Sequence, residues 1–201
     1  MSPKTTMDFE ALILAGGRGS RLGGIDKAEL HVHGRRLVDR VISAAREAGA
    51  TTVTVVGPDS AGTMADRVLR EQPAFGGPLA GIAAGIRHVT APWVMVLACD
   101  LQHPQAVITH LVFAPESGEA DGVILVDQDG REQWMAGTYR TESVARICDQ
   151  LGQAVANAPV RKALMPLSLE RRPISNQDSL DIDTPEALEQ ARAHQPTTRE
   201  D

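Results

Sequence analysis

Residues 11–27 read Ala-Leu-Ile-Leu-Ala-Gly-Gly-Arg-Gly-Ser-Arg-Leu-Gly-Gly-Ile-Asp-Lys, and this stretch decides the fold. Its first four residues are apolar and predict a buried strand, which a loop with five glycines follows. Glycines let the backbone approach a ligand closely and turn its amide groups toward it. Arg18, Arg21 and Lys27 add three cations to the same loop, and this combination suits a triphosphate. The alternative reading is a flexible surface loop.

Two familiar phosphate-binding motifs do not fit this loop. A dinucleotide fingerprint requires glycine where Leu22 stands. A Walker loop requires Lys and then Ser or Thr after the last glycine, but Ile25 and Asp26 follow Gly24. The first mismatch disfavours a dinucleotide-dependent oxidoreductase.

The rest of the chain alternates short apolar runs with amphipathic segments of helical length. Strands are predicted at 11–14, 51–56, 93–98, 121–126 and 133–139, and helices at 37–48, 77–88, 142–151 and 185–193. This alternation predicts an α/β fold with a mainly parallel sheet that helices cover on both faces. Ligands of such sheets bind beyond the carboxyl ends of the strands. We expect a flexible N-terminus at 1–8, one domain at 9–193 and a polar tail at 194–201.

Composition narrows the class of protein. The chain has 201 residues, of which 42% are hydrophobic and 23% charged, and this suits one soluble globular domain. Its net charge of −6 disfavours nucleic acid and anionic membranes as partners. No segment approaches the roughly 18 consecutive apolar residues of a membrane span. Cys99 and Cys148 are far apart and in no metal-binding pattern. A cytoplasmic location is the resulting expectation.

Two further segments carry residues suited to ligand binding. Asp100 follows the apolar run 93–98, so its carboxylate is expected at the ligand edge of the sheet, where it could hold magnesium. A turn former or a helix cap is the alternative role. The turn Gly76-Gly77-Pro78 leads into a helix whose free amides can face a ligand.

The pattern Leu-Ala-Gly-Gly-x-Gly-x-Arg-x-Gly-Gly-x-Asp-Lys at 14–27 resembles the opening signature of the molybdenum-cofactor nucleotidyltransferases. The resemblance implies a three-layer α/β/α, Rossmann-like fold in which the glycines wrap a nucleoside triphosphate. It assigns stabilisation of the phosphates to Arg21 and Lys27. Together with Leu-Ala-Gly-Gly, Gly-Pro-Leu-Ala-Gly at 77–81 resembles the guanylyl-transferring members.

This resemblance implies a set of site residues. The catalytic residues are Arg21, Lys27 and Asp100, and Asp100 also binds the metal, Mg²⁺ or alternatively Mn²⁺. The nucleotide-binding residues are Leu14, Ala15, Gly16, Gly17, Gly19, Lys27, Glu71, Gln72, Gly77, Pro78 and Leu79.

The closing segment 181–186, Asp-Ile-Asp-Thr-Pro-Glu, resembles a family motif that has asparagine in place of both aspartates. The asparagines are associated with the pterin side of the pocket, so Asp181 and Asp183 are predicted to bind the acceptor. Alternatively, Asp181 helps to hold the metal and Asp183 caps a helix. Arg161 and Lys162 either meet the phosphate of the acceptor or lie on a solvated helix face.

Three other positions depart from the family pattern. Gln102 stands where proline is usual, a change that affects the stiffness of the loop after Asp100. Gln72 stands where a carboxylate is common, although Glu71 is adjacent and can serve. Trp134 replaces a frequent proline and either shapes the acceptor pocket or packs in the core.

The resemblance implies a Mg²⁺-dependent guanylyltransferase that transfers GMP from GTP to the terminal phosphate of molybdopterin and releases pyrophosphate. Its partners would be these two small molecules, with transient contacts to proteins that make or receive the cofactor. The alternatives are cytidylyl transfer, transfer to another small phosphate, and a non-catalytic nucleotide-binding module of the same fold.

Overall fold

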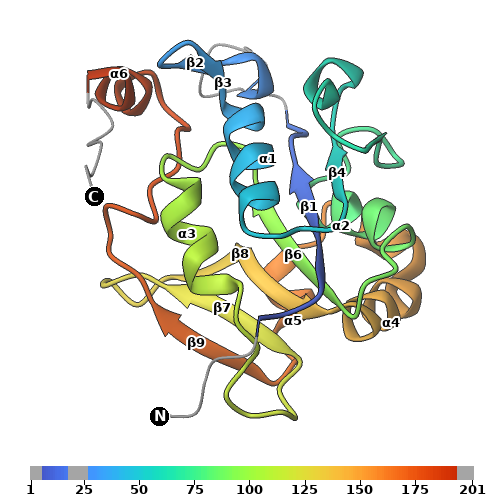
Figure 1. The fold of residues 1–201 in the computed structure, drawn as a ribbon. Helices are drawn as coiled ribbons and strands as arrows, with labels where there is room; N and C mark the ends of the chain where they lie inside the picture. Colours follow the sequence, from blue (N-terminus) through green and yellow to red (C-terminus); the bar gives the residue numbers. More distant parts are fainter. Residues whose placement is uncertain (1–5, 18–26, 194–201) are drawn as a thin grey trace.

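The computed structural model describes residues 6–17 and 27–193, and its centre is one seven-stranded sheet (Figure 1). The strand order is β5-β4-β1-β6-β8-β7-β9. The strands are β1 Phe9–Leu14, β4 Val53–Val56, β5 Arg67–Leu69, β6 Trp93–Ala98, β7 Gly122–Val126, β8 Glu132–Arg140 and β9 Leu169–Pro173. All neighbours pair in parallel except β8, which is antiparallel to both β6 and β7. The prediction of a mainly parallel sheet is confirmed.

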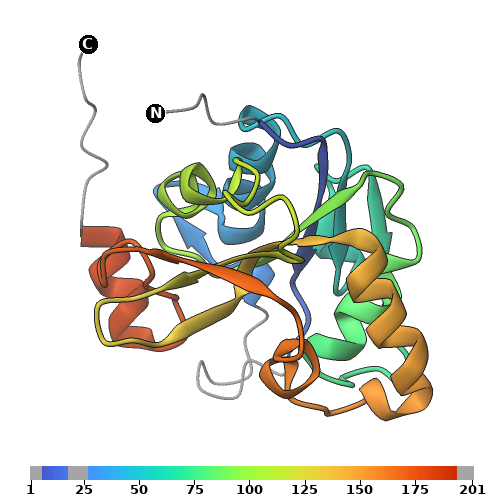
Figure 2. The same cartoon turned by 90° about the horizontal axis from the view of Figure 1, so that it is seen from below.

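Helices cover both faces of this sheet (Figures 1 and 2). They are α1 Leu37–Glu47, α2 Pro78–Ile86, α3 Pro104–Leu111, α4 Thr141–Leu151, α5 Val160–Leu164 and α6 Pro185–Ala193. Residues of α1 and α3 pack on one face, and residues of α2, α4 and α5 pack on the other. In β1, Ile13 belongs to the first of these cores and Leu12 to the second. None of the helices in the described part of the chain combines the length and the apolar character that crossing a bilayer requires.

A third, smaller apolar cluster joins the C-terminal helix to the segment that follows the glycine-rich loop. This segment consists of the short helix η2 Lys27–Glu29 and the two-stranded ribbon of β2 His31–Val32 and β3 Arg35–Arg36. Val32 and Leu37 pack there with Ile182 and Leu188. The C-terminal helix therefore packs on the segment that begins with Lys27.

Local sequence signals account for the ends of two helices. Helix α1 ends at Glu47, and the nearby Gly49 has φ of 96°, a conformation that glycine adopts without steric cost. Helix α2 begins at Pro78, which needs no amide partner at the first helical position. Gly77 precedes it with φ of 84°.

Other elements were not predicted. The edge strand β9 carries Glu170, Arg171 and Arg172 in succession, so it lacks the alternation that indicates a strand. Residues 6–8 also differ from the predicted flexible N-terminus, because Met7 is buried and its N–H donates to the carbonyl of Val112 at 3.1 Å. The predicted tail at 194–201 lies outside the described residues.

Candidate active site

A cavity of about 390 Å³ opens at the sheet edge where β1, β4 and β6 end. The beginning of α2 forms part of its wall, so the positive end of that helix dipole faces the cavity. Of the residues predicted for the site, those that line this cavity are Leu14, Ala15, Gly16, Gly17, Lys27, Glu71, Gly77, Pro78 and Asp100.

Of the other predicted nucleotide-binding and catalytic residues, two do not line it and two are not described. Gln72 is exposed and is not among the lining residues. Leu79 is fully buried in the core beneath the cavity. Gly19 and Arg21 lie outside the described residues.

The centre of the cavity is an ion pair between Lys27 and Asp100. The Nζ of Lys27 donates to Oδ2 of Asp100 at 2.5 Å, and only 12% of the Asp100 side chain is exposed. Burial alone would lower the pKa of Lys27, but the charge and hydrogen bond of Asp100 outweigh it and the pKa is raised. Lys27 is therefore a cation at neutral pH and is fixed in the cavity.

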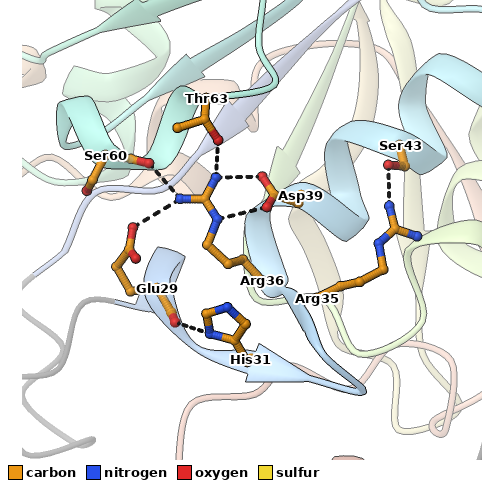
Figure 3. Close-up of polar contacts among 8 residues, drawn as sticks. All are labelled: Glu29, His31, Arg35, Arg36, Asp39, Ser43, Ser60 and Thr63. Atoms are coloured by element: carbon orange, nitrogen blue, oxygen red, sulfur yellow. Dashed lines mark hydrogen bonds and ion pairs between the residues drawn. The ribbon is translucent and has the colours of Figure 1, made fainter.

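The segment that carries Lys27 is held by a hydrogen-bonded network around Arg36 (Figure 3). The Arg36 guanidinium donates two bonds of 2.8 Å to the Asp39 carboxylate at the start of α1. It also donates to Glu29 in η2 at 3.1 Å, to the Ser60 carbonyl at 2.7 Å and to the hydroxyl of Thr63. Ser60 belongs to the short helix η3 Asp59–Gly62. One side chain thus joins the segment following Lys27 to two other parts of the fold.

We expect Arg36→Ala to lower the free energy of unfolding by about 2–3 kcal/mol, because it leaves Asp39 without its two-bonded partner. Urea unfolding measures this loss. Arg46→Ala is the matched control, since Arg46 lies at the other end of α1 and the side chains of its ion pair with Asp66 are both about 40% exposed. That control is expected to lose less than about 1 kcal/mol. Equal losses in both variants would contradict a structural role for the Arg36 network.

Asp181 lies beside this ion pair. It forms an antiparallel bridge with Leu101, and the N–H of Ile182 donates to the Asp100 carbonyl at 2.8 Å. Asp181 is exposed toward a second cavity, yet protein atoms displace water from around its carboxylate. This desolvation, and next the negative charge of Asp100, raise the pKa of Asp181 to about 7, while Lys27 acts in the opposite sense.

The raised pKa predicts a pH-dependent effect of Asp181→Asn in metal-free protein. Because the folded state favours the protonated acid, ionisation of Asp181 costs stability as the pH rises from about 4 toward 7. We expect little difference from the parent chain near pH 4, apart from the effect of the substitution itself. Near pH 8.5 the variant should gain about 1 kcal/mol, a screened value, or about 2–4 °C in Tm. A thermal shift that is the same at both pH values would contradict this assignment.

Glu71 lies on the opposite side of the glycine-rich loop from Asp100. Its residue surface is 8% exposed, and its Oε1 accepts the N–H of Phe75 at 3.0 Å. A β-carbon on Gly16 would come within 3.3 Å of the same oxygen, so the absence of a side chain at Gly16 leaves room for this carboxylate. Of the two adjacent candidates, Glu71 is thus the one that faces the cavity.

A second cavity, of about 530 Å³, adjoins the first, and the two share Gly77, Pro78, Ala98 and Met135. Because β8 runs antiparallel to β6, the beginning of β8 lies at this edge of the sheet and contributes Glu132 to the second wall. The remaining residues of this wall that the sequence singled out are Trp134, Arg161 and Asp181. The exposed Lys162 lies outside both linings, and Asp183 is half-buried next to Asp181.

Trp134 packs in the core, as one of its two predicted roles requires, and its part in acceptor binding stays a prediction. Its side chain is buried in the core together with Tyr139, and it also lines the second cavity. Arg161 is exposed at the cavity wall, and its Nε lies 3.8 Å from Oε2 of Glu132, whose Oε1 has a closer partner in Arg171. Among the described residues, Arg161 is the only cation that lines this wall, and it is weakly paired.

The donor atoms at Asp100 and Asp181 suit a hard divalent cation. Two carboxylates lie together with the single charge of Lys27, and their mutual repulsion would be relieved by a further positive charge. In residues 6–17 and 27–193 no group of three His, Cys, Asp or Glu side chains could hold a metal ion. A cation here would take its other ligands from phosphate oxygens and water, as Mg²⁺ commonly does.

Several lining residues were not predicted. Phe75 and Met135 line the first cavity, but neither belongs to a pattern that marks a site. Gly81 also lines it, and its place in the Gly-Pro-Leu-Ala-Gly stretch was an available signal. Asn157 lines the second cavity, and its N–H donates to the Gly76 carbonyl at 2.6 Å, a long-range contact without a sequence signature.

Comparison with known proteins now identifies the family. A family model described as the MobA-like NTP transferase domain matches residues 11–170. The chain belongs to this family. The match begins in β1 and ends in β9, so it includes both cavities except for the segment around Asp181.

Named relatives and solved structures agree with this assignment. The molybdenum cofactor guanylyltransferase of Cupriavidus necator is 35% identical over 136 residues, covering 63% of this chain and 66% of the relative. The enzyme of that name from Pseudomonas putida is 44% identical over 92 residues, covering 44% of this chain and 48% of the relative. These alignments thus span from about half to just under two thirds of the relatives' length.

The solved structure of molybdopterin-guanine dinucleotide biosynthesis protein A from Archaeoglobus fulgidus has a TM-score of 0.70 to this chain at 20% identity. The match covers 92% of this chain and 97% of that protein. At this level of identity the likeness concerns the fold. The predicted nucleotidyltransferase fold is confirmed.

Proposed function

We propose that this chain transfers GMP from GTP to the terminal phosphate of a molybdopterin-type acceptor and releases pyrophosphate. Mg²⁺ is the proposed metal, and Mn²⁺ is the alternative. The observation that carries the proposal is the Lys27–Asp100 pair inside a cavity lined by glycine backbone. The names of the two guanylyltransferase relatives support GMP as the transferred group.

The strand order supports one orientation of the nucleotide. Glu71 follows β5 at one side of the cavity, while Asp100 follows β6 beyond the glycine-rich loop of β1. The triphosphate would lie against the loop amides, Lys27 and Asp100. The base would lie toward Glu71.

A carboxylate at this position favours guanine. Guanine presents two adjacent N–H donors on its pairing edge, and the two oxygens of a carboxylate such as that of Glu71 can accept both. The same edges of adenine and cytosine each place an acceptor beside a single amino group. Either base would bring a lone pair against the Glu71 carboxylate, which an acidic site disfavours.

The chemical step needs no protein nucleophile. An oxygen of the acceptor phosphate attacks the α-phosphorus, and the bond from that phosphorus to the pyrophosphate oxygen breaks. The attacking phosphate is already ionised near neutral pH, so alignment and charge neutralisation suffice. A divalent cation at Asp100 would neutralise and orient the phosphates. Lys27 would offset charge on the departing pyrophosphate.

The second cavity is the proposed acceptor site. It adjoins the first through the shared wall at Gly77 and Ala98, so an acceptor phosphate could reach the nucleotide there. The weakly paired Arg161 on its wall offers a cation to an anionic acceptor. Asp181 would face both substrates from the boundary between the cavities.

We expect Lys27→Ala and Asp100→Ala each to lower turnover on the order of 100- to 1000-fold, because each removes a charge that faces the reacting phosphates. The measurement is pyrophosphate release with GTP, Mg²⁺ and a molybdopterin acceptor. Lys162→Ala is the control, since Lys162 is an exposed cation outside both cavities. Near-normal turnover in both site variants would overturn the proposed function, and release with CTP alone would replace GMP by CMP.

Glu71→Gln should weaken GTP binding on the order of tenfold, because one acceptor oxygen is replaced by a donor group. Calorimetric titration with GTP and with ITP separates the contact of the ring N–H with Glu71 from the contact of the 2-amino group, since ITP lacks the 2-amino group. The parent chain should prefer GTP over ITP, and the variant should lose most of that preference. An unchanged preference would place the base away from Glu71.

A further inference from the structure

The two carboxylates at the site belong to chain segments that are held together by backbone pairing. Leu101 and Asp181 are partners in an isolated antiparallel bridge. On one side of this bridge, the Ile182 N–H donates to the Asp100 carbonyl at 2.8 Å. The backbone carbonyl of Asp100 is therefore hydrogen-bonded directly to the segment that carries Asp181.

A second hydrogen bond closes the other side of the bridge, and it depends on the residue type at position 102. The Gln102 N–H donates to the Leu180 carbonyl at 2.9 Å. Proline has no N–H and could not make this bond. The glutamine that departs from the family pattern thus adds a backbone donor at the point where the two acidic segments meet.

Arg40 on α1 binds the other backbone group of Gln102, its carbonyl. Its Nη2 donates to the Gln102 carbonyl at 2.8 Å. Its Nη1 is buried without a hydrogen-bond partner among the described residues, and burial followed by the like charge of Arg35 lowers the pKa of Arg40. Burying a cation in this way is unfavourable. The bond to the Gln102 carbonyl satisfies part of this buried guanidinium, so Arg40 and Gln102 are held together.

We propose that Gln102 and Arg40 are positioning residues that hold the Asp181 segment against Asp100 so that both carboxylates can face one divalent cation. Arg40 donates a hydrogen bond to the backbone carbonyl of Gln102, and the backbone N–H of Gln102 donates one to the Leu180 carbonyl. This inference rests on the proposed function only in assigning a metal to the two acids.

We call the hydrogen-bonded pair of Gln102 and Arg40 the clamp, and the charge of the site explains why it is needed. The negative charge of Asp100 acts on the Asp181 carboxylate, and in metal-free protein this repulsion opposes the close approach of their two segments. The segment between β9 and α6, which carries Asp181, contains turns and a single bridge rather than a sheet strand. Without the Gln102 bond, one end of that bridge is open.

The test compares two substitutions at one position in metal-free full-length chain. Gln102→Pro removes the N–H, whereas Gln102→Ala retains it and removes only the side chain. We expect amide hydrogen exchange at Ile182 to be at least about tenfold faster in Gln102→Pro than in Gln102→Ala. Exchange in the central strand β6 reports any global loss of stability and is expected to change equally little in both.

Mn²⁺ titration followed by electron paramagnetic resonance, with GTP present, gives the second readout. Changing a residue that orients a metal ligand typically costs 10- to 100-fold in metal affinity. We expect about tenfold weaker Mn²⁺ binding in Gln102→Pro than in Gln102→Ala. Arg40→Met, which loses the bond to the Gln102 carbonyl, should change both readouts in the same direction and serves if Gln102→Pro does not fold.

The outcomes separate this inference from the proposed function. Equal Ile182 exchange and equal Mn²⁺ affinity in the two Gln102 variants, with no change in Arg40→Met, would overturn the clamp. Faster exchange without weaker Mn²⁺ binding would also overturn it as a positioning device for the metal. If the parent chain binds Mn²⁺ and GTP and both effects occur, but no GMP is transferred, the clamp stands and the proposed function fails.

Discussion

The ion pair between Lys27 and Asp100 is the contact on which the arrangement of the site depends. Its partners are 73 residues apart in sequence, and they meet only because β1 and β6 are adjacent in the sheet. Asp100 is almost fully buried, so without Lys27 or a metal its charge would be strongly unfavourable. The Arg36 network supports this pairing indirectly, because it anchors the segment that begins with Lys27.

Asp181 adds a second carboxylate beside the Lys27–Asp100 ion pair. Among the described residues around this pair, the carboxylates of Asp100, Asp181 and Asp183 face the single cation of Lys27. Such an arrangement reduces the stability of the free protein and is relieved when cationic groups arrive. The hydrogen bonds around Gln102 and Arg40 are consistent with a site that must be held together against its own charge. Stability and ligand binding are therefore opposed here.

Sequence reasoning predicted the parts of the fold that local patterns specify. The glycine-rich loop, the buried strand before Asp100 and the Pro78 helix start all follow from nearby residues. The choice between Glu71 and Gln72 required knowing which of them turns toward Gly16 after β5, and this depends on tertiary packing. The approach of Asp181 to Asp100 required the folded chain, because a single long-range bridge brings them together. The roles of these residues in catalysis remain predictions.

The reversed direction of β8 has a consequence for how this protein can diversify. The glycine-rich loop, Asp100 and the start of α2 belong to strand-to-helix connections, whose geometry the parallel part of the sheet constrains. The opposite wall is built on the first residues of an antiparallel strand and the short helix α5, away from those connections. Mutations at residues that line only the second cavity can reshape it while the lining of the first stays the same. Under the proposed function, drift at the exposed Arg161 would change which acceptor is bound while the residues proposed to bind the nucleotide stay the same.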